Sequence, residues 1–304
     1  MIEQASPAAQ TALTRKAFEI DTIPVIYTEM GTGDPIVLLH LPVNPMHVYK
    51  KTVPELAKHY RVITLDIRPI VASWYYEGYG TLLRFVTDYL VKALDRLGLT
   101  RVPVIASFMG CGVAMTLAIR NPDRVSRLVM ISPLGLTTRP KTSAFGLIFG
   151  LMNLPGMRSL FHLFMSNMAF QRAVLKFDQR VFGPYRVNEF FYQAPAEGIA
   201  HHLSQLYDGL GDPPNPFAFE TFINVIQHLR YREIRHLIPT IEQRTLLLFG
   251  EEDILIPAKT ARRYKATLPN SELHFVPKAR VFLHWEAADQ VNGLIREFLQ
   301  RRDK

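Results

Sequence analysis

The chain has 304 residues, of which 48% are hydrophobic and 20% are charged, a composition typical of a globular protein with a large core. Its only cysteine, Cys111, excludes a disulfide framework and a cysteine-rich zinc site. The formal net charge is +8, but the basic residues are dispersed along the chain. No basic stretch is interleaved with aromatic residues, so we expect no nucleic-acid partner.

The N-terminal residues show no apolar run of the kind found in a signal peptide. The longest apolar stretch, Ala144–Leu154, has about half the length needed to span a bilayer. We therefore expect a soluble, cytoplasmic protein with no membrane partner.

Short apolar runs alternate with amphipathic stretches in both terminal parts of the chain. After a tail of residues 1–16, a hairpin closed by Asp21-Thr22 is expected. The expected strands are 17–20, 24–28, 36–40, 61–65, 102–105, 127–131, 245–249 and 272–276. The expected helices are 53–59, 81–97, 113–120, 257–268 and 288–301. This alternation predicts a mostly parallel, twisted sheet flanked by helices.

The alternation stops between residues 134 and 239, which are rich in Phe, Met, Leu, Arg and His at helical spacing. We expect this segment to be a helical cap, or lid, inserted into a core domain made of residues 17–133 and 240–304.

The segment from Val102 to Ala114 reads as a buried strand, a tight turn and the start of a helix. Its small residues Ala106, Gly110 and Gly112 match a nucleophile elbow, in which a strained turn exposes a serine oxygen above a sheet. The apex residue is Phe108, whose side chain cannot attack a carbonyl. Serine-type acyl transfer at this position is therefore excluded.

With this elbow, the chain resembles the α/β-hydrolases that carry a helical cap, the branch that holds epoxide hydrolases, haloalkane dehalogenases and bacterial esterases. The resemblance covers roughly residues 18–133 and 240–300 and implies the α/β-hydrolase fold. Its further landmarks are His40, Asp66-x-Arg68, Asn121-Pro122-x-Arg124-Val125, Gly250-Glu251-x-Asp253-x-x-x-Pro257 and His284-Trp285-Glu286.

The chemistry of that family needs a nucleophile, a histidine base, a carboxylate that orients it and N–H donors for the oxyanion. The resemblance places Phe108 at the nucleophile position and Val281, after Arg280, at the base position. Leu41 replaces the glycine of the oxyanion loop, and the loop after Asp66 has lost its glycines. Only the acid Asp253 remains, with no histidine to orient, so the catalytic residues are unknown.

The replacements are bulky and apolar, and we expect them to form the floor of a substrate pocket. The expected pocket residues are Leu41, Pro42, Val43, Phe108, Met109, Val281 and Phe282. A collapsed pocket of a decayed hydrolase remains an alternative to a rebuilt binding cavity. The Phe and Met residues of the cap favour a large hydrophobic ligand (Phe145, Phe149, Met152, Phe161, Phe164, Met165, Met168 and Phe170).

Other reactive side chains are weak candidates. Ser107 should point away from the pocket, Cys111 should pack behind the sheet, and His284 fits a locally bonded residue at a helix start better than a displaced base. The remaining histidines considered are His162, His201, His202, His228 and His236. Their spacing gives no metal site, and we expect no metal and no cofactor.

Three classes of function remain open. The first is an epimerase or isomerase, because among family members without Ser and His the chain resembles the bottromycin-type peptide epimerases. That resemblance implies a bulky hydrophobic small molecule or a modified, macrocyclic peptide as partner, with epimerisation at an aspartate α-carbon beside a thiazoline. The second is a ligand-binding pseudoenzyme.

The third class is a hydrolase with a displaced site, such as Asp253 activating water directly. We rank it below the other two because the base and the oxyanion loop are lost. If this ranking is right, replacing Asp253 by asparagine should leave function nearly intact, because the acid has lost its histidine partner. A large loss of turnover in this variant would instead make Asp253 the working base. The sequence does not determine the oligomeric state.

Overall fold

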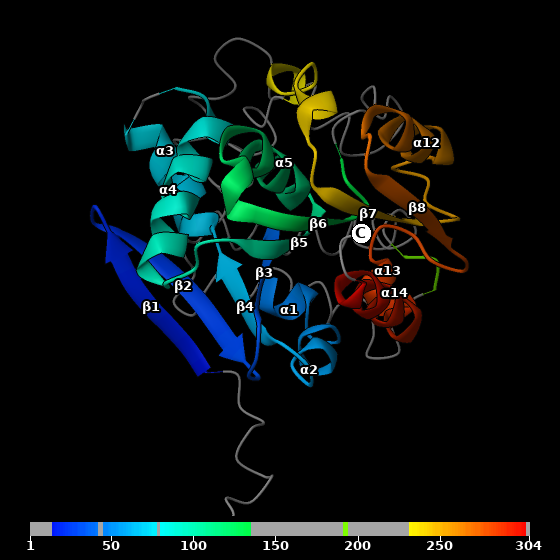
Figure 1. Cartoon of the computed structure of the whole chain (residues 1–304), viewed down its shortest axis with the longest axis horizontal. Coiled ribbons are helices and arrows are strands. Elements are labelled where there is room, and N and C mark those ends of the chain that lie inside the picture. The colour runs from blue at the N-terminus through cyan, green and yellow to red at the C-terminus, as the bar shows by residue number, and fades with distance from the viewer. Residues whose placement is uncertain (1–13, 42–44, 78–79, 135–190, 194–230, 302–304) are drawn as a thin grey trace, which may run out of the picture.

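The computed structural model describes residues 14–41, 45–77, 80–134, 191–193 and 231–301. Within these ranges an eight-stranded sheet runs through the molecule (Figure 1), in the order β1-β2-β4-β3-β5-β6-β7-β8. The strands are β1 (Thr14–Ile20), β2 (Ile23–Met30), β3 (Pro35–Leu41), β4 (Arg61–Asp66), β5 (Val102–Phe108), β6 (Val125–Ile131), β7 (Arg244–Gly250) and β8 (Ser271–Val276). β1 and β2 pair antiparallel, β2 pairs antiparallel with β4, and all other pairs are parallel. The expected sheet is confirmed.

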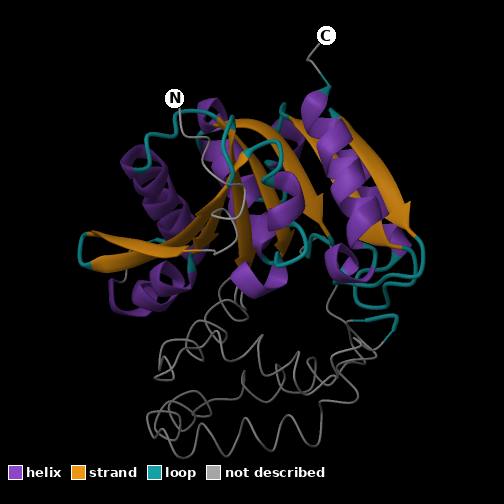
Figure 2. Cartoon of the chain, turned by 90° about the horizontal axis from the view of Figure 1, so that it is seen from below, coloured by secondary structure: helices purple, strands orange, loops and turns teal. Residues whose placement is uncertain are grey.

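The helices lie on both faces of this sheet (Figure 2). They are α1 (Pro45–Val48), α2 (Val53–Leu56), α3 (Arg68–Glu77), α4 (Leu82–Arg96), α5 (Gly110–Arg120), α12 (Ala258–Thr267), α13 (Leu283–Glu286) and α14 (Ala288–Gln300). Short 3₁₀ turns occur at Pro122–Arg124, Tyr231–Glu233 and Ile238–Thr240.

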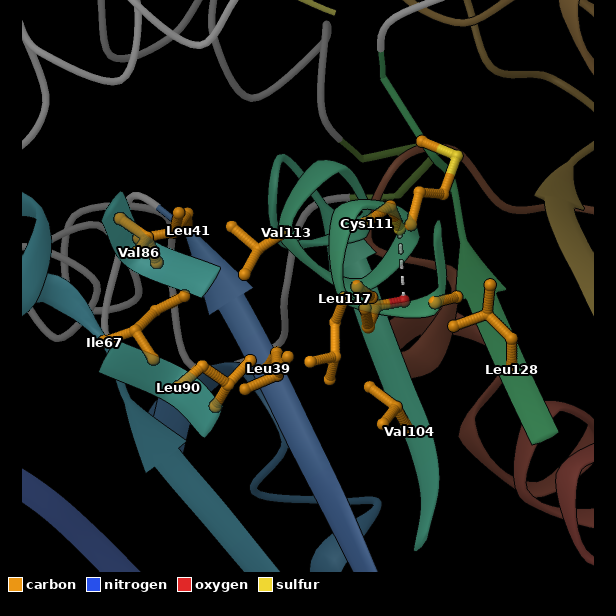
Figure 3. Packing of buried hydrophobic residues seen from close by; sticks show 14 of the residues in the cluster. Leu39, Leu41, Ile67, Val86, Leu90, Val104, Cys111, Val113, Leu117 and Leu128 are labelled. Atoms are coloured by element: carbon orange, nitrogen blue, oxygen red, sulfur yellow. Dashed lines mark hydrogen bonds between the residues drawn. The ribbon is translucent and has the colours of Figure 1, made fainter. Parts of the chain in front are cut away.

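The sheet separates two hydrophobic clusters. The first lies between the sheet and α3, α4, α5 and α12, and Figure 3 shows part of it, with Cys111, Val113 and Leu117 of α5 above Leu39 and Val104. The second lies between the opposite face and α1, α2, α13 and α14. Continuous burial along β3 and β7 follows from this coverage of both faces.

A hairpin turn and a helix cap explain two of the element boundaries. Asp21 and Thr22 both have positive φ, as a two-residue hairpin turn requires, so the expected hairpin is confirmed. The Thr81 side chain accepts the N–H of Arg84 and caps α4.

The structure also differs from the expected elements. β1 begins at Thr14, inside the expected tail, and the helix expected at 53–59 is only one turn long. The segment after Asp66, expected as a loop, is the helix α3. Without glycines this segment can continue as a helix, and the Asp66 side chain accepts the N–H of Arg68 at its start.

The end of the expected cap segment packs on the core. Tyr231 donates a hydrogen bond to the Met109 carbonyl at 3.3 Å, and Ile238 is fully buried in the first cluster. The remainder of the expected cap is outside the described residues, apart from Phe191, Tyr192 and Gln193. Of the helices that the structure describes, none has both the length and the apolar character needed to cross a bilayer.

Candidate functional site at the strand ends

The turn after β5 has the geometry of a nucleophile elbow. Phe108 is the last residue of β5 and has φ of 50°, a strained value for a residue with a bulky side chain. α5 begins at Gly110, where a Cβ would lie 3.0 Å from the Cα of His40 and from the Leu39 carbonyl oxygen. The turn therefore has the strained apex of a nucleophile elbow and its close packing at Gly110, but the side chain at the apex is the benzyl group of Phe108.

Apolar residues flank this apex in the sheet and along the chain. Leu41 is fully buried and is the register partner of Phe108 across β3 and β5. Met109, Val281 and Phe282 are also buried, and the ring of Phe282 stacks on that of Phe191 with 5.0 Å between centroids. Pro42 and Val43 lie outside the described residues, so the complete pocket floor stays a prediction.

A buried polar cluster lies beneath the elbow. His40 and Ser107 are register partners, and the Nδ1 of His40 is 2.5 Å from the Oγ of Ser107. The Tyr49 hydroxyl lies 2.9 Å from the same oxygen and 2.8 Å from the Leu39 carbonyl oxygen. The sequence analysis named His40 as a family landmark and expected Ser107 to point away from the pocket, but it did not pair the two and gave no signal for Tyr49.

Burial keeps this cluster neutral. It lowers the pKa of His40 well below its usual value, and nearby His284 and Arg68 lower it further. Burial likewise raises the pKa of the Tyr49 hydroxyl well above its usual value. Ser107 is only 1% exposed, and its oxygen is engaged by two neighbours, so we interpret the cluster as structural.

Replacing Ser107 by alanine should therefore lower stability and spare activity. The loss of a shared partner for His40 and Tyr49 should cost about 1–3 kcal/mol in the free energy of unfolding, measured in urea. We expect kcat to change by less than about threefold. The control is Ser73→Ala, which removes a partly buried hydroxyl bonded to the Pro69 carbonyl. Loss of all turnover in a folded Ser107→Ala variant would instead identify Ser107 as a displaced nucleophile.

The two other reactive candidates are also buried. The Cys111 thiol bonds to the Ala106 carbonyl at 3.3 Å, and burial raises its pKa far above the usual range. His284 lies in α13, with its ring 5.6 Å from that of Tyr49 and 5.9 Å from that of Phe282. Neither environment favours a thiolate nucleophile or a solvent-accessible base.

The most distinctive titratable group is Asp253, on the loop after β7. Its side chain is only 6% exposed, and Oδ1 accepts the N–H groups of Leu255 at 2.9 Å and Ile256 at 2.8 Å. Its other oxygen, Oδ2, is buried and has no hydrogen-bond partner within the described part of the chain. Burial raises the pKa of Asp253 to about 7, although the two N–H groups and Arg280 oppose the shift.

The loop that carries Asp253 packs against the loop after β8. The Glu252 side chain accepts the N–H of Ala279 at 3.1 Å, and the N–H of Glu252 donates to the Ala279 carbonyl. Asp253 therefore lies beside the segment that holds Val281, where the family resemblance implies a histidine.

Ser132 is a residue that the sequence analysis missed. It follows β6, is fully buried and has φ of 44°. Its Oγ has no hydrogen-bond partner within the described ranges. The only sequence signal was a serine before a proline at the end of a buried strand.

Metal-ligand clusters are not found among the described residues. Of the cap histidines only His236 is described, and it is exposed. The other cap histidines and the Phe and Met residues of the cap lie outside the described ranges. A groove between α2 and α14 contains none of the expected pocket residues; it is lined by Glu55, Leu56, Asp289, Asn292, Gly293 and Arg296.

Comparisons with known proteins support the fold. The family described as "alpha/beta hydrolase fold" matches residues 34–161. A solved serine hydrolase from Cycloclasticus zankles is 18% identical, with a TM-score of 0.70 over 95% of this chain and 98% of that one. A meta-cleavage product hydrolase from Pseudomonas fluorescens IP01 is 20% identical, with a TM-score of 0.67 over 93% and 97% of the chains. The chain has the α/β-hydrolase fold.

The relatives in sequence are named as hydrolases. A 2-hydroxy-6-oxononadienedioate/2-hydroxy-6-oxononatrienedioate hydrolase from Pseudomonas sp. is 25% identical over 90% of both chains. A 2-hydroxy-6-oxo-2,4-heptadienoate hydrolase from Pseudomonas putida is 26% identical over 90% of this chain and 92% of its own.

These names contradict the expected epimerase or isomerase. They agree with the coarser expectation of an enzyme, because each of these relatives is named as a hydrolase. The functional ranking drawn from the sequence was wrong because it rested on residues that are missing from the elbow and the base position. Those absences bear on the mechanism expected at the elbow, whereas similarity along nine-tenths of the chain bears on the reaction class.

Proposed function

We propose that the chain is a hydrolase that adds water directly to a carbonyl substrate, with Asp253 as the general base. The observation that carries this proposal is the buried Asp253 carboxylate, with one oxygen fixed by two backbone N–H groups and the other without a hydrogen-bond partner among the described residues. A base with a pKa near 7 is suited to proton transfer at neutral pH.

The reaction balances without a covalent intermediate. The Asp253 carboxylate accepts a proton from water as the water oxygen bonds to the carbonyl carbon, and a tetrahedral oxyanion forms. The bond to the leaving group then breaks, and protonated Asp253 returns the proton to that group. This route does not use the elbow side chain, which is consistent with Phe108 at the apex.

The relatives suggest which carbonyl compounds to test. Their names describe 2-hydroxy-6-oxo dienoates, which carry a ketone at carbon 6 and a carboxylate. The formal net charge of +8 is compatible with an anionic substrate of this class.

The test is turnover of 2-hydroxy-6-oxo-2,4-heptadienoate and of an activated aliphatic ester by the full chain in ¹⁸O-labelled water. We expect ¹⁸O in the acid product of at least one substrate, with kcat/KM rising through pH 7 and then levelling. The activity should persist after treatment with a serine-directed fluorophosphonate. Covalent labelling of a serine with loss of activity would overturn the proposal, and tight binding without turnover would favour a ligand-binding protein.

A further inference from the structure

Ser132 combines two unfavourable features at one buried position. Its φ of 44° lies in the left-handed region, which costs a residue with a Cβ about 1–2 kcal/mol. Its fully buried Oγ has no hydrogen-bond partner within the described ranges, although a buried hydroxyl normally has one. A position that keeps both strain and an unsatisfied polar atom is a candidate for function.

Hydrogen bonds place Ser132 between the elbow and the loop of Asp253. The N–H of Ser132 donates to the Leu248 carbonyl of β7 at 2.8 Å. The N–H of Leu134, two residues later, bonds to the Phe108 carbonyl at 3.4 Å. Because β5, β6 and β7 are parallel neighbours, their ends bring Phe108, Ser132 and the Asp253 loop to one edge of the sheet.

The proposed reaction needs a donor for the oxyanion that forms at the substrate carbonyl. Leu41 stands where the family resemblance implies a glycine of the oxyanion loop, and it is fully buried. Ser132 directly follows β6, the strand between β5 and β7, and its hydroxyl has no hydrogen-bond partner in the described part of the chain, so its O–H can serve as that donor.

Resting on the proposed function, we infer that the Ser132 Oγ–H donates a hydrogen bond to the substrate carbonyl oxygen and stabilises the oxyanion when water adds. Ser132 is then a catalytic residue that forms no covalent bond. Its strained backbone is retained because it holds the hydroxyl at the end of β6.

The test compares Ser132→Ala with wild type in steady-state kinetics and thermal unfolding, using the substrate that wild type hydrolyses. Removing one oxyanion donor should lower kcat about 100-fold with KM little changed, since the bond strengthens only in the transition state. Removing an unsatisfied buried hydroxyl should leave Tm unchanged or raise it by about 2–4 °C. A merely structural serine would give lower Tm and unchanged kcat.

Two further variants keep the test decisive. Ser132→Gly also removes the hydroxyl and tolerates positive φ, so it should reproduce the loss of kcat in a folded protein even where alanine perturbs the turn. Ser73→Ala, which removes a bonded hydroxyl from α3, should leave kcat unchanged.

The outcomes separate this inference from the proposed function. Normal kcat in Ser132→Ala together with inactive Asp253→Asn would overturn the role of Ser132 alone. Normal kcat in both variants would overturn the proposed function as well. An acyl group found by mass spectrometry on Ser132 would show a nucleophile and overturn the role as a donor.

Discussion

Replacing Asp253 by asparagine is expected to lower kcat by at least about 100-fold, because general-base catalysis by a positioned side chain contributes about 10²–10⁴-fold. Asparagine keeps the oxygen that accepts the N–H groups of Leu255 and Ile256, so the loop should keep its structure. This expectation replaces the one drawn from the sequence, in which Asp253 had no histidine to orient and its replacement by asparagine left function nearly intact.

The same substitution should change the pH dependence of stability. The native pKa of about 7 lies above the unfolded value, so ionisation of Asp253 opposes folding. Wild-type stability therefore loses a contribution of about 4 kcal/mol as pH rises from about 4 to 7. Urea unfolding should show that Asp253→Asn gains stability relative to wild type over this range.

Glu251→Gln is the matched control for this experiment. Glu251 is the exposed acid two residues earlier on the same loop, and its replacement should leave kcat unchanged. Full activity in Asp253→Asn would show that this carboxylate is not the base. A decrease in its stability at pH 8 would contradict a buried Oδ2 that has no hydrogen-bond partner among the described residues.

Gly250→Ala is expected to cause a large loss of stability. A Cβ on Gly250 would lie 2.2 Å from the Ala279 carbonyl oxygen and 2.6 Å from that of Arg280, both backbone atoms. The loop after β8 must move to admit it, and we expect a loss of about 3 kcal/mol or more in the free energy of unfolding. Activity should also be lost, because this loop packs against the loop of Asp253.

Gly293→Ala provides the control for that change. Gly293 lies within α14, and a Cβ there would meet no atom within 4 Å. Alanine should stabilise the helix by about 0.5–1 kcal/mol, measured by the same urea unfolding. Equal stabilities of the two variants would mean that the β7 and β8 loops are not packed as described.

The fold could be predicted from the sequence because its signals are local. Continuous apolar runs of β-branched residues mark strands buried on both faces, and the small residues Ala106, Gly110 and Gly112 mark the elbow. The helix α3 was missed because family resemblance suggested a loop, although the segment has no glycine and its start is capped by Asp66.

The sequence by itself determined the order of the elements, the elbow and the replacement of its nucleophile by Phe108. Only the tertiary structure decided which polar side chains have hydrogen-bond partners. It brought His40, Ser107 and Tyr49 into a closed hydrogen-bonded cluster. Within the described ranges, it left Asp253 and Ser132 each with an oxygen that has no hydrogen-bond partner. Periodicity and motifs predict local geometry, whereas hydrogen bonding and pKa depend on burial and on neighbours from distant parts of the chain.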